Sequence, residues 1–346
     1  MKLLIRATNW VGDVIMALPA LQAVRARFPE SKVSILALSY VADIYRGQGV
    51  ADELIEYDRG GEHNGIRGRE KLAAALREKK FDTALLMQNA FDAAWIAWRA
   101  GIPKRIGYDR DGRGLLLTQA IRVPRAGEIP AHEKFYYLEL LKRAGWIDSV
   151  PEVSEISLRI TEEQAQHAEE KLQSLGSRRG TVRIAVGAGA SYGSAKCWPP
   201  ERFAQALNRL VKGREAEVLL FGTPAEAGVS AAIQAGLHKP AIDLTGKTQI
   251  VELPALLSRC TAFLGNDSGA MHVAAAVGLP VVAVFGPTDP HGTAPVTRRC
   301  TIVQEKPYCS PCFLRRCPTD HRCMRAITPE IVSAGMLRQL AEVSAG

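Results

Sequence analysis

Residues 263–290 read FLGNDSGAMHVAAAVGLPVVAVFGPTDP, and this stretch decides the fold class of the chain. It predicts a strand, a polar turn, an Ala-rich helix and a second buried strand, which cover residues 263–264, 266–269, 271–277 and 281–285. Open parallel α/β sheets bind ligands at turns that follow the carboxyl ends of their strands. Backbone N–H groups and the helix dipole favour a phosphate at the start of the helix. The stretch therefore predicts a site for a phosphate-bearing substrate.

Four residues of this turn are candidates to contact that substrate: Asp267, Ser268, Gly269 and His272. Each also has a purely structural interpretation. Asp267 or Ser268 is a suitable N-cap, His272 is compatible with a satisfied histidine on a first helical turn, and Gly269 with a backbone role. Taken singly, the two interpretations are balanced. Their grouping between two apolar strands favours a binding site.

The composition is that of a globular protein large enough for one large or two medium domains. The chain has 346 residues, of which 47% are hydrophobic and 23% charged, and its formal net charge is +8. No apolar window is long enough for a transmembrane helix, and early charges interrupt any signal-peptide core, so we expect a cytoplasmic protein. The positive charge suits an anionic substrate or an anionic membrane surface. Nucleic acid is not expected, because no nucleic-acid-binding module is recognisable.

Strands alternate with helices along two halves of the chain, which predicts two Rossmann-like, doubly wound α/β domains with a cleft between them. The polar segment 148–161 reads as their connection, and Thr161 as the cap of the helix that follows. We therefore expect domains over residues 1–160 and 161–346.

The cysteines do not suggest a disulfide framework, because their number is odd and the expected compartment is reducing. The last four form the pattern C-x2-C-x4-C-x5-C, with His321 among them; they are Cys309, Cys312, Cys317 and Cys323. Thiolates at this spacing are compatible with zinc or an iron–sulfur cluster, but the spacing matches no standard site of either kind. Free or redox-active thiols remain the other interpretation.

The first half carries its candidate chemistry in the loop that follows its first strand. Thr8–Asp13 reads TNWVGD, in which Gly12 predicts a turn and Asp13 stands near a helix start at about Val14. Asp13 is either an N-cap or a carboxylate that faces the cleft as a general base.

Three strand-end loops of the second half add candidates. Gly187–Lys196 reads GAGASYGSAK, which lacks the third glycine of a dinucleotide fingerprint but suits a phosphate, with Ser191 in the loop and Lys196 placed to neutralise a leaving phosphate. Glu226 is a candidate acceptor for ribose hydroxyls or a surface glutamate. Thr245 belongs to a loop that either lines a nucleobase pocket or forms a plain turn.

Three sequence blocks together resemble glycosyltransferase family 9. They are N-W-V-G-D near the start, G-A-x5-K-x-W-P in the middle, and N-D-S-G-x-M-H-x-A-A with G-P-T-D-P further on. The resemblance covers nearly the whole chain. Within the family, the chain is similar to the members that add the second heptose of the lipopolysaccharide inner core, and the cysteine-rich stretch K-P-Y-C-S-P-C-F-L-R-R-C-P resembles that subgroup as well.

The resemblance implies a GT-B fold, an ADP-heptose donor bound mainly by the C-terminal domain, and an acceptor, heptosyl-Kdo-lipid A, bound by the N-terminal domain at the inner face of the cytoplasmic membrane. It implies inversion at the anomeric carbon without a metal or other cofactor. Asp13 matches the family's catalytic base, Lys196 its phosphate-binding lysine, and the turn at 267–272 its donor-contacting turn. Asn9, Trp10 and Gly12 belong to the first block and are expected to bind substrate. Ala270 stands where the family often has Pro.

Because the acceptor is anionic, Arg6, Arg105 and Lys134 are candidates to hold it. Other activities remain as alternatives: transfer of the first heptose to Kdo-lipid A, nucleotide-sugar epimerisation on the same fold, a nicotinamide dehydrogenase, disfavoured by the missing glycine, and non-catalytic binding of nucleic acid.

Overall fold

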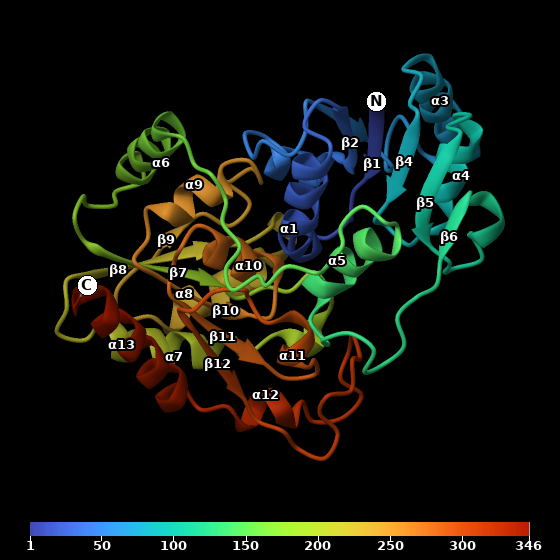
Figure 1. Ribbon diagram of the computed structural model, residues 1–346. Coiled ribbons are helices and arrows are strands. Elements are labelled where there is room, and N and C mark those ends of the chain that lie inside the picture. The colour runs from blue at the N-terminus through green and yellow to red at the C-terminus, as the bar shows by residue number, and fades with distance from the viewer. Residues whose placement is uncertain (346) are drawn as a thin grey trace. The chain divides into compact units, whose positions relative to one another are not determined.

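The protein is described here from a computed structural model, which covers residues 1–345 and contains two α/β units (Figure 1). Unit 1 comprises Met1–Val153, and unit 2 begins at Ser154. Each unit has one six-stranded parallel sheet.

The division between the units falls inside the segment 148–161 that the sequence predicts as a connection. The end of this segment belongs with unit 2, because the backbone N–H of Leu158 donates to the carbonyl of Ala276 at 2.8 Å. Thr161 caps the next helix, as predicted, through a capping box with Gln164.

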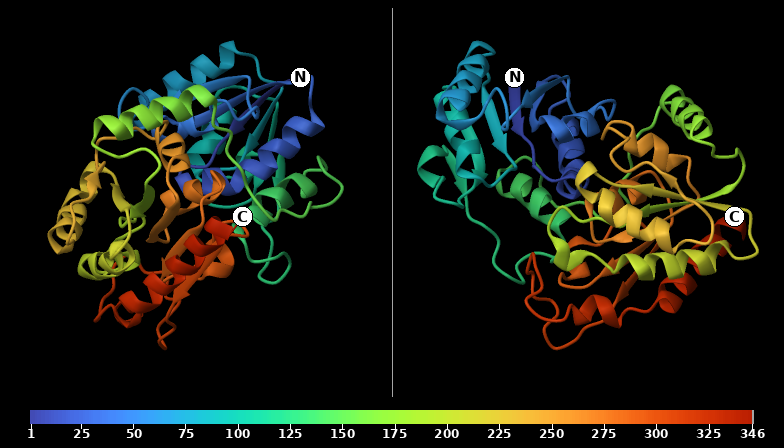
Figure 2. Two further views of the ribbon diagram at one scale, coloured as in Figure 1. Left: turned by 90° about the vertical axis from the view of Figure 1, so that its left-hand side faces the viewer. Right: turned by 180° about the vertical axis from the view of Figure 1, so that it is seen from behind.

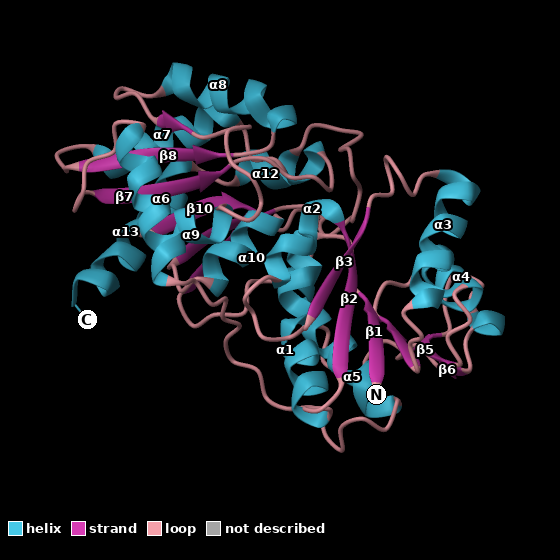
Figure 3. Ribbon diagram, turned by 90° about the horizontal axis from the view of Figure 1, so that it is seen from above, coloured by secondary structure: helices cyan, strands magenta, loops and turns pink. Residues whose placement is uncertain are grey.

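Unit 1 alternates strands and helices. Its strands are β1 (Lys2–Arg6), β2 (Lys32–Leu38), β3 (Glu53–Tyr57), β4 (Thr83–Leu86), β5 (Lys104–Tyr108) and β6 (Gln119–Ile121). Its helices are α1 (Val11–Arg27), α2 (Ser39–Ala42), α3 (Gly65–Glu78), α4 (Phe91–Arg99) and α5 (Glu133–Arg143). Helix α1 packs with α5 on one face of the sheet, and α3 packs with α4 on the other (Figure 3).

Unit 2 repeats this plan. Its strands are β7 (Val182–Gly187), β8 (Ala216–Phe221), β9 (Ile242–Asp243), β10 (Ala262–Asn266), β11 (Val281–Phe285) and β12 (Cys300–Gln304). Its helices are α6 (Glu162–Ser174), α7 (Pro200–Val211), α8 (Ala227–Gly236), α9 (Leu253–Ser258), α10 (Gly269–Ala276), α11 (Pro290–Thr293), α12 (Arg322–Ala326) and α13 (Pro329–Ala345). Helices α7, α8 and α13 pack together on one face, and α6, α9 and α10 on the other (Figure 2).

The two sheets share one topology. Their orders are β3-β2-β1-β4-β5-β6 and β9-β8-β7-β10-β11-β12, so each follows the Rossmann order 3-2-1-4-5-6. The predicted fold class, two doubly wound α/β domains, is confirmed. Strand β11 has the predicted bounds, and all five of its residues are buried.

The predicted start of α1 is wrong. The helix begins at Val11 with Trp10 as N-cap, and the backbone N–H of Val14 donates to the carbonyl of Trp10 at 2.9 Å. Gly12 therefore lies inside the helix and forms no turn. The low helix propensity of glycine, which costs about 1 kcal/mol relative to alanine, is outweighed by the buried apolar run that follows.

Eight elements escape the sequence analysis: the strands β3, β6 and β12 and the helices α2, α8, α9, α11 and α12. The three strands lie at the edges of their sheets, where one side of the backbone is unpaired and the side chains are only partly buried. Their sequences therefore lack the continuous apolar run that identifies the central strands. Among residues 1–345, no helix combines the length and the apolarity that crossing a membrane requires.

Candidate active site

The predicted turn of unit 2 lies where the strand order of its sheet reverses. β7 and β10 are neighbours in the sheet, and their registers pair Gly187 with Gly265 at the carboxyl edge. Ligands of doubly wound sheets bind at this switch point. The loops that follow both strands meet here and, together with the first turn of α10 (Gly269–Ala276), carry six of the twelve predicted site residues.

Asp267 is the centre of a buried hydrogen-bonded group at this edge. Its Oδ2 accepts from Lys196 Nζ at 2.5 Å and from Thr288 Oγ1 at 2.6 Å. Lys196 is 9% exposed, Asp267 4% and Thr288 6%. Three loops that are distant in sequence are therefore joined by one carboxylate oxygen. Thr288 belongs to the G-P-T-D-P block, but the sequence analysis did not single it out.

Lys196 is held from two sides. Besides its ion pair with Asp267, its ammonium lies 4.8 Å from the ring centroid of Tyr192. Removing one partner of a buried ion pair leaves the other charge uncompensated and costs about 3–5 kcal/mol. The arrangement fixes the Lys196 ammonium at the carboxyl edge of the sheet.

Ser268 is the N-cap of α10, but its side chain does not cap. Its backbone is extended, and no side-chain cap hydrogen bond forms at this end of α10 within the described chain. Ser268 Oγ is buried and lacks a hydrogen-bond partner among residues 1–345. Ser268 thus occupies the N-cap position that the structural interpretation allows, but no side-chain hydrogen bond caps the helix within the described chain. A buried hydroxyl beside uncapped helical N–H groups is what an anionic ligand would satisfy.

Gly269 and His272 follow in the first turn of α10. Gly269 is the first residue of the helix, so its N–H is one of the groups at the helix start. His272 is 4% exposed and is engaged in the structure. Both lie in the same turn of the same helix as the unsatisfied hydroxyl.

Gly187 and Gly189, at and after the end of β7, let the backbone lie close to the side chains of Phe263 and Glu226. A Cβ at Gly187 would lie 2.7 Å from the ring of Phe263, and a Cβ at Gly189 would lie 1.7 Å from Glu226 Oε1. A side chain at position 189 would therefore displace the Glu226 carboxylate. The G-x-G of this loop is explained by that packing.

Glu226 is a structured residue at the end of β8. Its Oε2 accepts from the backbone N–H of Thr223 at 2.7 Å and from Thr223 Oγ1 at 3.0 Å, which completes a capping box. Its Oε1 is the atom directed toward Gly189. The carboxylate is therefore oriented toward the loop that carries Lys196.

Thr245 and Ser191 lie in the two loops that remain. The Thr245 hydroxyl forms a buried 2.6 Å hydrogen bond with Ser230, and its backbone N–H donates to Asp243 at 2.9 Å. Its methyl group lies beside Gly222 and hence beside Glu226. Ser191 is exposed in the turn after β7.

Asn266 is a residue that the sequence analysis missed as a positioning group. It is fully buried, accepts from the backbone N–H of Trp198 at 3.0 Å, and donates to the carbonyl of Ala188 at 2.5 Å. Its amide thus ties the residue before Asp267 to both ends of the Lys196 loop. The sequence signal that could have found it is a lone Asn at the end of an otherwise apolar strand.

In unit 1, the loop after β1 is held by a buried guanidinium. Arg6 is 1% exposed and donates to Asn9 Oδ1 at 2.8 Å and to the carbonyl of Ala7 at 2.6 Å. The carbonyl of Asn9 accepts from the hydroxyl of Tyr40. Asn9 is thus a fixed part of the loop, whereas the Trp10 side chain is 46% exposed.

Asp13 occupies the third position of α1, in its first turn, and is not the N-cap. The helix dipole favours a negative charge there. Burial raises the pKa of Tyr45 and of Tyr137, and the Asp13 carboxylate raises each further. The carboxylate therefore lies in a setting of buried phenols on the carboxyl edge of the β1 strand.

Arg113 is a second buried guanidinium of unit 1, and nothing in the sequence identified it. It is fully buried and donates to the carbonyls of Tyr108 and Gln88 and to Asn89 Oδ1. Burial lowers its pKa to about 10, so it stays charged at neutral pH.

The three side chains that the sequence analysis proposes for binding an anionic acceptor form hydrogen bonds within their own unit. Arg6 lies in the core, and Arg105 donates to the carbonyls of Leu116 and Ile102 at 2.7 and 2.5 Å. Lys134 donates to the carbonyl of Val153 at 2.6 Å. Each of these three candidates for acceptor binding donates to backbone carbonyls of its own unit.

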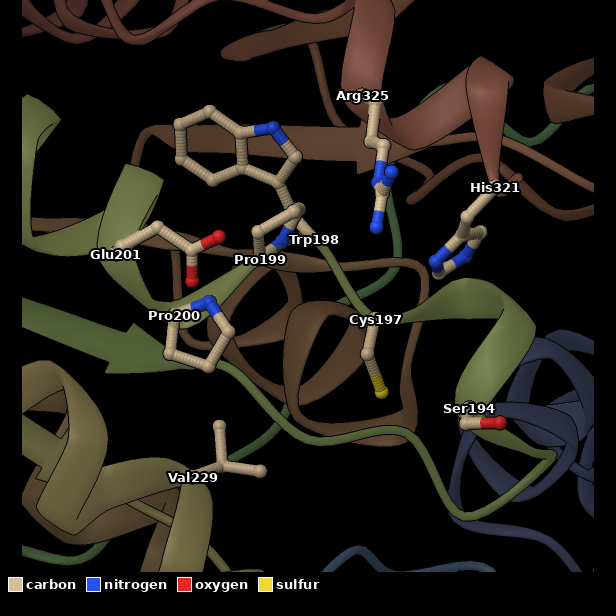
Figure 4. A pocket seen from close by; sticks show the side chains of 9 residues that line it. All are labelled: Ser194, Cys197, Trp198, Pro199, Pro200, Glu201, Val229, His321 and Arg325. Carbon is tan, nitrogen blue, oxygen red and sulfur yellow. The ribbon is translucent and has the colours of Figure 1, made fainter.

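A separate pocket of unit 2 lies beside the Lys196 loop (Figure 4). Its lining residues are Ser194, Cys197, Trp198, Pro199, Pro200, Glu201, Val229, His321 and Arg325. None of these is a predicted site residue. In Figure 4 the Cys197 sulfur points away from Trp198, and His321 and Arg325 come from the α12 side. His321 Nε2 is hydrogen-bonded to the carbonyl of Ala195 at 2.7 Å.

All seven cysteines are free thiols in the structure. Across the described part of the chain, no group of three or more His, Cys, Asp or Glu side chains is arranged to hold a metal ion.

Known proteins resemble this chain in both sequence and structure. The family described as glycosyltransferase family 9 (heptosyltransferase) matches residues 69–322. The chain is 30% identical over 312 residues to lipopolysaccharide heptosyltransferase 2 of Salmonella typhimurium, with 88% of each chain covered. It is 29% identical over 313 residues to the protein of that name from Escherichia coli, again with 88% of each chain covered.

A solved structure, that of the E. coli ADP-heptose LPS heptosyltransferase II, superposes with a TM-score of 0.82 at 26% identity and covers 99% of both chains. A glycosyltransferase family 9 structure from Veillonella parvula superposes with a TM-score of 0.84 at 24% identity, over 99% of this chain and 97% of that one. These likenesses show a GT-B type fold.

Proposed function

The chain belongs to glycosyltransferase family 9, and on that premise we propose that it is an inverting heptosyltransferase that uses ADP-heptose as its donor. The transferred sugar is L-glycero-D-manno-heptose, and the acceptor is the first heptose of the lipopolysaccharide inner core on Kdo-lipid A. The relatives favour this second transfer over transfer to Kdo or epimerisation.

Unit 2 binds the donor in this proposal. The observation that carries it is the unsatisfied, buried Ser268 hydroxyl at the uncapped start of α10, next to the buried Lys196–Asp267 pair. The diphosphate supplies the acceptor oxygens that this hydroxyl and the first N–H groups of α10 need. Gly269 admits the phosphate to the helix start, and His272 borders it.

Lys196 stabilises the charge that develops on the leaving group. An ammonium has three donors, and one of them is occupied by Asp267. The other two are available for diphosphate oxygens as the bond between the anomeric carbon and the phosphate oxygen breaks. Asp267 and Thr288 keep the ammonium in place, so its charge is preorganised before the reaction.

Asp13 of unit 1 is the general base. It takes the proton of the acceptor hydroxyl while the hydroxyl oxygen forms a bond to the anomeric carbon, and ADP leaves with the electron pair of the broken bond. Attack on the face opposite to ADP inverts the anomeric centre. The first-turn position on α1 favours the ionised carboxylate that a base requires.

The remaining predicted residues have binding roles. Glu226 offers its Oε1 to the ribose hydroxyls, and Ser191 borders the phosphates from the loop after β7. Thr245 lines the nucleobase end by its methyl group, because its hydroxyl is taken by Ser230. Asn9, Trp10 and Gly12 line the acceptor side of unit 1, where the exposed indole of Trp10 suits a sugar face.

The acceptor is a lipid, so the protein acts at a membrane surface. We place the acceptor on unit 1 and the protein at the inner face of the cytoplasmic membrane. The net charge of +8 suits a phosphorylated acceptor and an anionic leaflet.

A two-acceptor assay tests this function. The purified protein is incubated with ADP-heptose and either a Kdo-terminated or a heptose-terminated core fragment, and ADP release is measured. We expect ADP release only with the heptose-terminated fragment. Release with the Kdo-terminated fragment alone identifies the first transfer instead. ADP release with neither acceptor, from a protein that binds ADP, refutes the transferase assignment.

A further inference from the structure

The segment between β12 and α12, residues 305–321, presents large apolar side chains to solvent. Tyr308 is 85% exposed, Phe313 57% and Leu314 44%. The segment has no helix or strand and stands at the rim of unit 2, orange-red in Figures 1 and 2. Large exposed apolar side chains in one short segment are typical of a surface that binds a partner.

The same segment is basic. Across residues 305–321 it contains three exposed basic residues, Lys306, Arg315 and Arg316, and two exposed acidic residues, Glu305 and Asp320. At its end, the acidic Asp320 is paired with Arg322 at 2.9 Å. The surface therefore combines aromatic and aliphatic side chains with an unbalanced positive charge.

The backbone of the segment is fastened to the donor-binding edge, so its side chains are held outward. The N–H groups of Cys312 and Phe313 donate to the carbonyl of Pro287 at 3.0 and 2.8 Å. The N–H of Ala195 donates to the carbonyl of Arg315 at 3.1 Å. Ser310 Oγ donates to the carbonyl of Gly286 at 2.6 Å. With these bonds in place, the apolar side chains cannot turn inward to bury themselves.

We propose that this segment, the 305–321 loop, is a docking surface for an anionic lipid bilayer. Tyr308, Phe313 and Leu314 insert at the interface, while Lys306 and Arg316 contact lipid phosphates. Charge complementarity selects the lipid: aromatic and leucine side chains next to cations are the composition of interfacial membrane anchors. The proposal rests on the proposed function, because an enzyme with a lipid-anchored acceptor works at such a surface.

Vesicle binding tests the loop without any acceptor present. The whole protein is sedimented with vesicles of phosphatidylcholine alone or of phosphatidylcholine mixed with phosphatidylglycerol. We expect binding to the mixed vesicles, with a strong decrease at high salt and on neutral vesicles. The triple variant Tyr308→Ser, Leu314→Ser, Arg316→Gln should lose vesicle affinity by tenfold or more, about fivefold of it from the removed cation.

A matched control changes the same kinds of exposed side chain in unit 1. Ile66 is 72% exposed, Leu115 is 100% exposed, and Arg67 is an exposed cation. The variant Ile66→Ser, Leu115→Ser, Arg67→Gln should bind vesicles like the wild type. Equal binding by the loop variant and the wild type, or a wild type that ignores anionic vesicles, overturns the proposal and leaves a protein partner as the occupant of the loop.

The vesicle-binding result can be distinguished from a failure of the proposed transferase activity. Both variants should bind ADP normally and should turn over a water-soluble core fragment at the wild-type rate, which also shows that they are folded. Loss of turnover with that fragment in all three proteins counts against the proposed function, whereas the vesicle result concerns the loop alone.

Discussion

The two sheets have the same strand order, but the buried cations at their carboxyl edges have different partners. In unit 1, Arg6 and Arg113 are buried cations that bind backbone carbonyls and amide oxygens, and the acid Asp13 stands in the first turn of α1. In unit 2, the buried cation Lys196 is paired with the buried acid Asp267. Strand order therefore decides where a site forms, and the loop residues decide its chemistry.

The difference also separates two ways to stabilise a loop. The unit 1 guanidinia use several donors each to hold loop carbonyls, which rigidifies the loops without supplying a group to a ligand. The unit 2 edge keeps an ammonium with free donors and a hydroxyl with no partner among the described residues, so its groups are incomplete until a ligand binds. The following predictions test this comparison, beginning with the largest effect.

The most severe loss is expected for Asp13→Asn in unit 1. Removing the base should lower turnover about 10²- to 10⁴-fold while ADP affinity stays unchanged, because unit 2 is the donor site that we propose. Steady-state kinetics and ADP titration measure the two quantities. Glu162→Gln, which neutralises a first-turn carboxylate of α6, is the control for the helix dipole and should retain full activity. A folded Asp13→Asn protein with near-normal turnover would remove the catalytic role.

Lys196→Met should affect both activity and stability. We expect turnover to fall about 10²- to 10³-fold, because a donor to the leaving group is lost. The free energy of unfolding should fall by about 3–5 kcal/mol, because Asp267 is left buried and unpaired. The double variant Lys196→Met, Asp267→Asn should recover stability in urea denaturation but not turnover. Recovery of both would mean that the pair is only structural.

The ion pair at the opposite end of β7 should contribute to the free energy of unfolding but not to ADP binding. Arg183 hydrogen bonds to Glu169 lower the pKa of that carboxyl to about 2 from its ordinary value of 4.5. The stabilisation is complete above pH 4.5 and is lost as the pH falls toward 2, with a total of about 3 kcal/mol. Urea denaturation across this acid range should show a flatter pH dependence for Glu169→Gln, with unchanged ADP affinity at neutral pH. An equal slope in both proteins contradicts the assignment.

The smallest effect compares two N-caps. Ser268→Ala removes a hydroxyl without a partner among residues 1–345, so unfolding free energy should change by less than about 0.5 kcal/mol while ADP affinity weakens roughly fivefold or more. Thr161→Ala breaks the capping box of α6 and should cost about 1 kcal/mol of stability with normal ADP affinity. Calorimetry of ADP binding and urea denaturation distinguish the two. The reverse pattern would make Ser268 an ordinary cap.

Local patterns predicted the central elements well. β11 is apolar throughout because both faces of a parallel sheet are covered, and such a run is visible without any tertiary information. The edge strands β3, β6 and β12 were missed because partial exposure allows polar side chains there. The start of α1 was misplaced because Gly12 reads as a turn locally, whereas the buried helix face that follows outweighs its propensity.

The candidate site divides in the same way. The turn at Asp267 was recognisable because its polar residues are contiguous between two apolar strands. The sequence did not identify Arg113 as a buried cation. Its hydrogen-bond acceptors, at Tyr108, Gln88 and Asn89, lie at or after the ends of β5 and β4 and are brought to it only by folding. The sequence analysis proposed Glu226 as a binding residue. The structure adds that position 189 has no room for a side chain, because the Glu226 carboxylate lies against it.

The sequence by itself determined two doubly wound halves, the turns that follow their strands and a family membership, because periodicity and contiguous motifs are local properties of a chain. Only the tertiary structure decided which of those turns act together. Lys196 and Asp267 are 71 residues apart, and they meet because β7 and β10 become neighbours when the strand order reverses. Burial then makes the loss of either partner of this ion pair costly. The same packing leaves the Ser268 hydroxyl without a partner among residues 1–345. Both effects depend on the packing of distant segments, which no local pattern encodes.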